Sequence, residues 1–351
     1  MKKFIKTLLC VLLCVALLGA GFILYLTVTE FKPAPVEELA VHLDPASRSM
    51  QAGDTLDVLS WNIGYGGLGA ESDFFMDGGS QVKAADKQTV LRYLDGIASY
   101  LASTAPDLVM LQEVDVNSAR TYGIDEAQKL SFGTWVHAQN YSCDFVPFPW
   151  PPIGKVHSGL LTTTAGFPID RAERIALPCP FSWPVSAANL KRCLLVSYLP
   201  IEGSEAQLVL VNLHLEAYDD GEGKRAQTEQ LRSFIQSEYE KGNYVIAGGD
   251  FNQVFPGSLA VYPNTHPELW EPGVLEDSLL PAGWSFAYDN SKPSCRLLNQ
   301  PYDPSDADNT QHYVIDGFIL SPNVELNRVE TVDLGFENSD HNPVRIHITL
   351  G

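Results

Sequence analysis

Four apolar segments of this chain each lead to a polar side chain that can bind a metal ion or transfer a proton. They are Leu59-Ser60-Trp61 before Asn62, Val109-Met110-Leu111-Gln112 before Glu113, Val211-Asn212-Leu213 before His214, and Val245 to Gly249 before Asp250 and Asn252. Each segment has the length and composition of a buried strand, so each polar group is expected at the C-terminal end of a strand. We therefore expect a fold that gathers several strand ends at one edge.

Two segments near the C-terminus extend this pattern. Asp316 follows Tyr313-Val314-Ile315, and Asp340-His341 lies just before the strand expected from Val344. An antiparallel strand begins where its neighbours end, so Asp340 and His341 are expected at the same rim. Carboxylate, amide and imidazole groups gathered there suit a hard divalent cation and in-line attack at phosphorus.

Each of these residues has a simpler explanation when it is taken alone. Asn62, Asn252 and Asp250 would then be turn or cap residues. Glu113 would be a solvated side chain, and His214 a hydrogen-bonded core histidine. The joint interpretation is favoured because all the groups are of the required types and all lie at strand ends.

Strand-like and helix-like patterns alternate from Thr55 onward. Helices are expected over 82–101 and 224–239, where apolar residues recur at helical spacing. Strands are expected over 56–63, 108–114, 158–163, 193–199, 208–215, 244–248, 313–320, 328–332 and 344–350. Many strands, few helices and no repeat favour an α/β sandwich, in which two sheets pack face to face with helices outside, over a barrel or a doubly wound sheet.

Gly64, Gly66 and Gly69 form a G-x-G-x-x-G pattern after a strand, as in a dinucleotide-binding turn. That fingerprint requires a helix to open at the last glycine, whereas residues 71–79 continue as a loop. We therefore interpret this segment as a flexible loop beside the site.

The segment Thr7 to Val28 holds 22 residues without a charge. As a helix it would be about 33 Å long, enough to cross the hydrocarbon core of a bilayer. Three lysines precede it, so the positive-inside rule keeps the N-terminus in the cytoplasm and exports the chain from about Glu30 onward. Residues 1–30 are thus expected to be a cytoplasmic tip and signal anchor, 31–53 a linker, and 54–351 the catalytic domain; cleavage of the anchor is the alternative.

The exported part is strongly acidic. Residues 31–351 carry 20 basic and 42 acidic side chains, a net charge of −22. We therefore expect no stable nucleic-acid complex, because such binding needs many Lys and Arg side chains facing phosphates. Among the four exported cysteines, Cys179 and Cys193 are the nearest pair in sequence and the expected disulfide.

The motifs described above occur in a specific order along the chain. Trp61-Asn62, Leu111-Gln112-Glu113, Asn212-Leu213-His214, Gly249-Asp250-Phe251-Asn252, Ile315-Asp316 and Ser339-Asp340-His341-Asn342-Pro343-Val344 together resemble the signature of the endonuclease/exonuclease/phosphatase superfamily. The resemblance covers about residues 55–350 and implies the deoxyribonuclease-I-like fold, a four-layer sandwich of two packed mixed β-sheets flanked by helices. It also implies hydrolysis of phosphate esters with Mg²⁺, for which Mn²⁺ is an alternative.

The resemblance also implies a role for each site residue. Glu113 would be the principal metal ligand, with Asn62 and Asp340 beside it. Asp316 would orient His341, and either His341 or Asp250 would be the general base. Asn252 and His214 would donate hydrogen bonds to the phosphoryl oxygens.

Two parts of the family pattern are less defined here. Tyr141 and His157 are the candidates for a partner that some members supply between the Glu113 and His214 motifs. Arg120 would contact a second phosphate or form a structural salt bridge.

The sequence allows three functions. The first is a single-pass, membrane-anchored phosphodiesterase, monomeric and with its catalytic domain extracellular, that acts on a phospholipid or related headgroup ester. The anchor, the acidic surface and the aromatic loops at 74–76 and 145–152 favour it. The second is an extracellular nuclease or an inositol-phosphate-type phosphomonoesterase, because the superfamily includes nucleases, sphingomyelinases and inositol-polyphosphate phosphatases. The third, a non-catalytic binding module, is disfavoured by the intact site residues.

Overall fold

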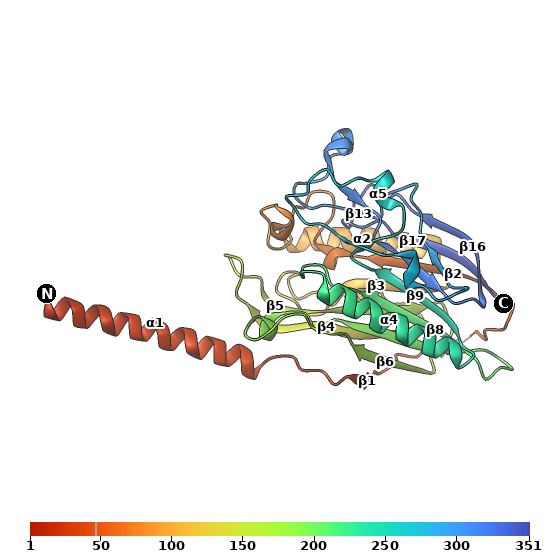
Figure 1. Cartoon of the computed structure of the whole chain (residues 1–351), viewed down its shortest axis with the longest axis horizontal. Helices are drawn as coiled ribbons and strands as arrows, with labels where there is room; N and C mark the ends of the chain where they lie inside the picture. Colours follow the sequence, from red (N-terminus) through yellow and green to blue (C-terminus); the bar gives the residue numbers. More distant parts are fainter. Residues whose placement is uncertain (46–47) are drawn as a thin grey trace.

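Two mixed β-sheets packed face to face form the centre of the domain in this computed structural model, which describes residues 1–45 and 48–351, apart from the side chains of 307–309 (Figure 1). The seven-stranded sheet has the order β1 (Val36–Glu38), β6 (Arg171–Ala176), β7 (Cys193–Pro200), β8 (Gln207–His214), β9 (Tyr244–Asp250), β15 (Asp316–Leu320), β12 (Ser285–Ala287). The six-stranded sheet has the order β16 (Val324–Thr331), β17 (Val344–Leu350), β2 (Thr55–Asn62), β3 (Leu108–Asp115), β5 (Gly154–Thr164), β4 (Thr134–Val146). Each sheet has one parallel pair, β2–β3 or β8–β9, and is otherwise antiparallel.

Helices cover the outer face of each sheet and complete four layers. Alternation along the strands makes this possible: Val58 packs between the sheets, whereas Leu59 faces α2 (Lys87–Thr104). On the other side, Leu231 and Ile235 of α4 (Glu222–Glu240) pack against the seven-stranded sheet. The expected sandwich is therefore confirmed.

Shorter elements lie in the connections. They are the helices α3 (Glu126–Leu130) and α5 (Ser258–Val261), the 3₁₀ turns η1 (Gly64–Gly66), η2 (Phe75–Asp77), η3 (Val185–Ala188), η4 (Asp277–Leu279) and η5 (Pro304–Asn309), and the two-stranded pairs β10 (Gln253–Val254) with β11 (Gly273–Val274) and β13 (Cys295–Arg296) with β14 (His312–Tyr313).

Most expected elements are present, but several differ from expectation. The helix expected from Val82 begins at Lys87, because Asp86 caps it by accepting a hydrogen bond from the Thr89 amide at 2.8 Å. The strand expected over 313–320 is divided into β14 and β15. Strands β1, β4, β6 and β12 of the two sheets were not expected. β4 is an edge strand whose alternate side chains are only partly buried, so polar residues interrupt its apolar pattern.

The segment 31–53 does not run free between helix and domain, although residues 46–47 lie outside the described part. Its strand β1 pairs with β6, and the His42 ring stacks on Trp135 with centroids 3.8 Å apart. Pairing satisfies backbone groups at the sheet edge, which a free tether would leave to water. The boundaries at residues 30 and 53 stay predictions.

The N-terminal helix α1 (Lys2–Val28) extends away from the domain and is long and apolar enough to cross a membrane (Figure 1). A signal sequence meets the same criteria, so anchoring belongs with the proposals below.

The expected Cys179–Cys193 disulfide is wrong, because all six cysteines are free thiols. Cys193 lies on β7 in the core between the sheets, whereas Cys179 is exposed in a loop. Nearness in sequence therefore did not bring the two sulfur atoms together.

Candidate active site

The strand ends meet at one rim, contributed by both sheets. On the seven-stranded sheet His214 ends β8, Asp250 ends β9 and Asp316 begins antiparallel β15; His214 and Asp316 are the register partners of Asp250 on either side. On the six-stranded sheet Asn62 ends β2, and Glu113 lies near the end of the parallel strand β3.

The last strand supplies two more groups at this rim. β17 runs antiparallel to β2 and pairs Val344 with Ser60, which brings the preceding Asp340 and His341 to the end of β2. Two hydrogen bonds hold this turn: Trp61 Nε1 donates to the His341 carbonyl and Ser339 Oγ donates to the Asn62 carbonyl, both at 2.8 Å. All eight predicted site residues therefore belong to this one region or its immediate surroundings.

Asn62 connects the two sheets within the site. Its Nδ2 donates to Asp250 Oδ2 at 2.9 Å and lies 3.4 Å from Glu113 Oε1. His214 Nε2 is 3.5 Å from Asp250 Oδ2 and 4.0 Å from Glu113 Oε1. An amide and an imidazole thus separate two carboxylates, which lowers their repulsion.

His341 and Asp316 form a buried pair. Asp316 Oδ2 lies 2.8 Å from His341 Nδ1 and also accepts a 2.7 Å hydrogen bond from Ser294 Oγ. Ser294 is itself fixed, because its hydroxyl oxygen accepts from the amides of Ile315 and Asp316. With Nδ1 engaged, His341 directs Nε2 toward Asp250 Oδ2 and Asp340 Oδ2, each 3.8 Å away.

Burial and neighbouring charges shift the proton affinities of these groups. Burial, with the Asp316 charge added, raises the pKa of Asp250 to about 7. Burial and the Glu113 charge likewise raise the pKa of Asp340 to about 7. Burial opposes protonation of His341, but the adjacent Asp316 charge outweighs it and holds the His341 pKa well above its ordinary value.

His214 has the opposite shift. Burial, reinforced by the positive charge of Arg192, moves the His214 pKa well below its ordinary value, so this imidazole is neutral. A neutral imidazole can donate one hydrogen bond without carrying a charge.

Positive φ angles orient two of the side chains. Glu113 has φ +56° at a register shift between β3 and β5, so the strand is bulged where the carboxylate leaves it. Asn252 has φ +50°; its amide donates to Asp250 Oδ1 at 2.8 Å, and its Nδ2 donates to the Leu215 carbonyl at 2.9 Å. Such conformations are costly for non-glycine residues and occur preferentially at functional sites.

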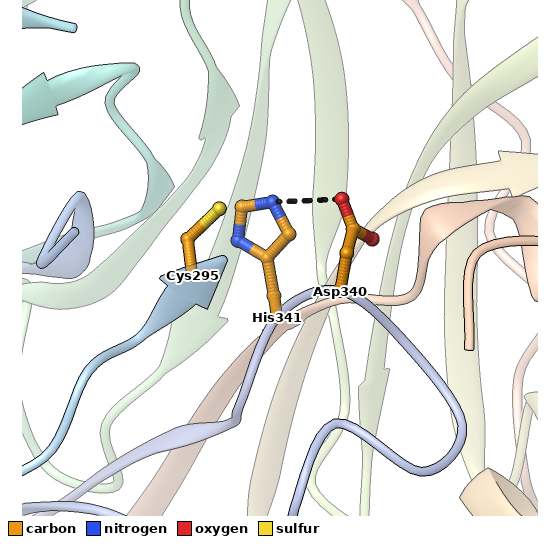
Figure 2. Close-up of side chains that lie close together, drawn as sticks. All are labelled: Cys295, Asp340 and His341. Carbon is orange, nitrogen blue, oxygen red and sulfur yellow. Dashed lines mark ion pairs between the residues drawn. The ribbon is translucent and has the colours of Figure 1, made fainter. Parts of the chain in front are cut away.

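The carboxylates of Glu113 and Asp340 suit a hard divalent cation, and the raised pKa of Asp340 reflects burial and the nearby Glu113 charge, which a cation would compensate. Asn62 turns its Nδ2 toward Glu113, and its Oδ1 accepts a hydrogen bond from the Gly64 amide at 3.0 Å, so its amide lies beside this pair without presenting an oxygen to it. Two groups, neither of which contains Glu113, have ligand atoms within 4.8 Å of one another: Asp250, Asp316 and His341, and Cys295, Asp340 and His341. In the second group the thiol of Cys295 faces the His341 ring, and the ion pair of His341 with Asp340 lies on the other side of the ring (Figure 2).

Cys295 does not suit such an ion. Burial raises the pKa of its thiol to about 12, so the sulfur stays protonated, and sulfur is a soft ligand. The oxygen set is therefore the better match to Mg²⁺ or Mn²⁺.

The sequence patterns missed Ser294, Cys295 and Asp77. The first two lie in the long 255–311 stretch, which has no strand periodicity. Asp77 lies in the loop after the glycine pattern, where Tyr218 donates a 3.0 Å hydrogen bond to it and burial raises its pKa to about 6. An aspartate amid a loop carries no signal in sequence that separates it from a turn residue.

Arg120, Tyr141 and His157 each have contacts of their own. Arg120 forms a bidentate ion pair with the buried Asp115, with bonds of 2.8 and 2.9 Å, which agrees with the structural salt bridge. Tyr141 donates to the Ala188 carbonyl, and His157 lies 3.9 Å from Asp144. Neither of these side chains contacts Asp250 or His341 through a hydrogen bond.

The site opens into a cavity of about 660 Å³. Glu113, His214, Asp250, Asp340 and His341 line one part of it. Apolar side chains line much of the rest, and they include Phe22, Ile23 and Leu26 of α1 together with Phe74, Phe75, Met76, Phe148 and Val185. The cavity thus joins the polar cluster to the base of the N-terminal helix.

A sequence profile described as Endonuclease/Exonuclease/phosphatase family matches residues 59–341, which include all eight predicted site residues. The chain belongs to this family. As a family member it is a hydrolase of phosphate esters, and such enzymes generally depend on a divalent metal ion. No curated protein matches the chain.

Solved structures of the family share the fold. An endonuclease/exonuclease/phosphatase from Beutenbergia cavernae DSM 12333 has a TM-score of 0.55 at 16% identity and covers 85% of this chain and 72% of its own. The endonuclease/exonuclease/phosphatase from Bacteroides vulgatus has a TM-score of 0.51 at 15% identity, over 85% of this chain and 100% of its own. ANGEL2, described as a 2',3'-cyclic phosphatase, has a TM-score of 0.53 at 14% identity, over 90% of this chain and 98% of its own.

Proposed function

We propose that this family member is a membrane-anchored phosphodiesterase that hydrolyses a phospholipid or related headgroup ester on the extracellular side. The observation that carries the proposal is the shared cavity, in which apolar residues of α1 and of the aromatic loops lead to the polar cluster. A lipid presents both chemistries at once, a phosphate for the polar end and an acyl chain for the apolar end. The net charge of −22 over residues 31–351 also supports a lipid over a tightly bound nucleic acid.

Glu113 and Asp340 would hold the divalent ion, with Asn62 beside it directly or through water. Mg²⁺ is favoured, and Mn²⁺ would be able to replace it. When bound, the ion supplies Lewis-acid stabilisation of negative charge on the phosphoryl oxygens. The chain's own residues position the phosphate and move the protons.

Asp250 takes the proton of the attacking water, because its pKa near 7 matches the range in which a general base works efficiently. His341, whose Nε2 lies 3.8 Å from Asp250 Oδ2 and whose pKa is held well above its ordinary value, stabilises the developing negative charge. Asp316 engages Nδ1 of His341 and so fixes the orientation of the ring. Neutral His214 and the second N–H of the Asn252 side-chain amide supply hydrogen bonds to the phosphoryl oxygens.

The test is product analysis with the full-length protein in detergent micelles containing Mg²⁺. Sphingomyelin, phosphatidylinositol, inositol phosphates, DNA and RNA are offered separately, and His341→Ala is the matched control. We expect release of a phosphorylated headgroup or a free headgroup from a lipid by the wild type alone. Cleavage of DNA or RNA with every lipid intact would replace this proposal by the extracellular nuclease, and release of phosphate from inositol phosphates alone would replace it by the phosphomonoesterase.

A further inference from the structure

Four large apolar side chains are exposed where α1 meets the domain. Phe148 is 69% exposed, Trp150 88%, Trp183 60% and Val185 57%. They come from two loops, the β4–β5 connection and the segment leading into η3, and we call them the aromatic rim. Large apolar groups clustered on a surface commonly mark a contact with another molecule or with a membrane.

The aromatic rim adjoins the base of α1. Trp183 Nε1 donates a 2.9 Å hydrogen bond to Thr27 Oγ1, and Phe22 packs edge-on against Phe145 with ring centroids 5.9 Å apart. Leu26 is buried against Val146 and Ala187. The β4–β5 loop projects from the same end of the domain at which α1 leaves it (Figure 1).

The free side of α1 stays apolar down to its last turn. Leu24 is 63% exposed and Val28 is 76% exposed, while Thr27, between them on the same turn, accepts a hydrogen bond from Trp183 Nε1. A bilayer deep enough to cover Leu24 and Val28 therefore reaches the level of Trp183. No polar spacer separates the span from the domain at this point.

We propose that the aromatic rim inserts into the bilayer that α1 spans, so that the catalytic domain lies on the membrane surface. Trp is enriched at the interface between hydrocarbon and water, where its ring is buried and its N–H stays hydrogen-bonded. The contact is hydrophobic, because a domain with a net charge of −22 is not attracted to anionic headgroups.

Docking in this way directs the cavity toward the lipid. Phe148 and Val185 belong to both the aromatic rim and the cavity wall, so this part of the cavity wall would face the bilayer. The inference rests on α1 as an anchor and holds for any substrate.

The experiment identifies the tryptophans that lie in the membrane from the lipid quenching that is lost when each is substituted. The full-length protein is reconstituted in phosphatidylcholine vesicles whose acyl chains carry bromine, which quenches nearby indole fluorescence. Wild type is compared with Trp150→Phe, Trp183→Phe and the double variant. Trp284→Phe is the matched control, because Trp284 packs against Tyr239 of α4 with centroids 5.6 Å apart and is only 9% exposed.

We expect each rim variant to lose part of the quenchable emission, the double variant to lose at least about half of it, and the control variant to lose none. Raising the salt concentration should leave the quenching unchanged, since screening affects only the electrostatic part of binding. Equal quenching in wild type and the Trp150→Phe variant would overturn the proposal, as would failure of the wild type to remain with the vesicles.

This readout requires no turnover. A failed product analysis with intact quenching would reject the lipid substrate but not the docking, and the reverse result would reject only the docking.

Discussion

His341 Nδ1 lies 2.8 Å from Asp316 Oδ2, and both side chains are almost wholly buried. The two residues come from different sheets, since Asp316 begins β15 and His341 precedes β17. The contact therefore requires the two sheets to be packed, and it orients the imidazole before any substrate binds. Asp316 is in turn held by Ser294, so the pair has little freedom to rotate.

Because His341 and Asp316 form a pair, we expect the effects of their substitutions on turnover not to be additive. His341→Ala should lower turnover by at least about a hundredfold, within the range of general acid–base groups. Asp316→Asn should lose much of the same factor, because it no longer favours the required tautomer and charge. The double variant should be little worse than His341→Ala alone, since groups that act as a unit are not additive. Multiplicative losses on a verified substrate would show that the residues act independently.

We expect the dependence of activity on a divalent cation to rely chiefly on Glu113. Glu113→Gln should abolish most activity and weaken the response to added Mg²⁺, because the amide keeps the shape but loses the charge. Glu325→Gln, at an exposed position on β16, is the matched control and should behave as wild type. Activity that survives excess EDTA undiminished would contradict the metal assignment.

We expect a proton and a divalent cation to compete at Asp340, and thermal stability should reveal this competition. Its pKa is about 7 in the folded state against an ordinary value of 3.8. Between about pH 4 and pH 7 the folded state thus keeps a proton that the unfolded chain releases, so this group's contribution to metal-free stability falls as pH rises. A cation displaces that proton, so the gain in Tm from Mg²⁺ should be larger at about pH 8 than at about pH 5.5.

The matched variant for this experiment is Asp340→Asn, in which the dependence of the Mg²⁺ effect on pH should be reduced. Differential scanning fluorimetry with and without Mg²⁺ measures both proteins. A gain in Tm that is equal at the two pH values would argue against proton–metal competition.

Gly64 should be intolerant of a side chain because of the site it adjoins. A Cβ there would lie 2.7 Å from Asp340 Oδ1 and 2.9 Å from Leu68 Cβ. Gly64→Ala should therefore displace Asp340 and reduce both cation affinity and turnover. Gly53→Ala is the control. Its φ is also positive, +88° against +51° at Gly64, but the space around it is open, so the variant should lose only about 1 kcal/mol of stability and retain activity. Equal behaviour of the two variants would mean that backbone strain alone matters.

The anchor predicts an exposed domain. Protease added to intact cells that express the full-length chain should digest the domain, while a cytosolic marker protein stays whole. The physical reason is the positive-inside rule, by which the three lysines before the span should keep the N-terminus in the cytoplasm. Recovery of most of the full-length protein from the cytosol would refute this orientation.

Much of the site followed from local pattern. Asn62, Glu113, His214 and Asp250 are each adjacent in sequence to a buried strand, so the strand itself locates them. Ser294 has no such neighbour; it reaches Asp316 because the long 255–311 stretch returns to β15. A contact made by a segment without strand or helix periodicity cannot be predicted from a single sequence.

The sequence by itself determined the apolar spacing of most strands and of the helices, the residues at the strand ends and the uncharged N-terminal span. These features depend on the order of neighbouring side chains, which sets local structure directly. Only the tertiary structure decided that β1 pairs with β6, that Cys179 and Cys193 stay apart and that Phe22 and Leu26 share a cavity with His341. Those arrangements depend on how distant segments pack, and packing is set by shape and burial over the whole domain.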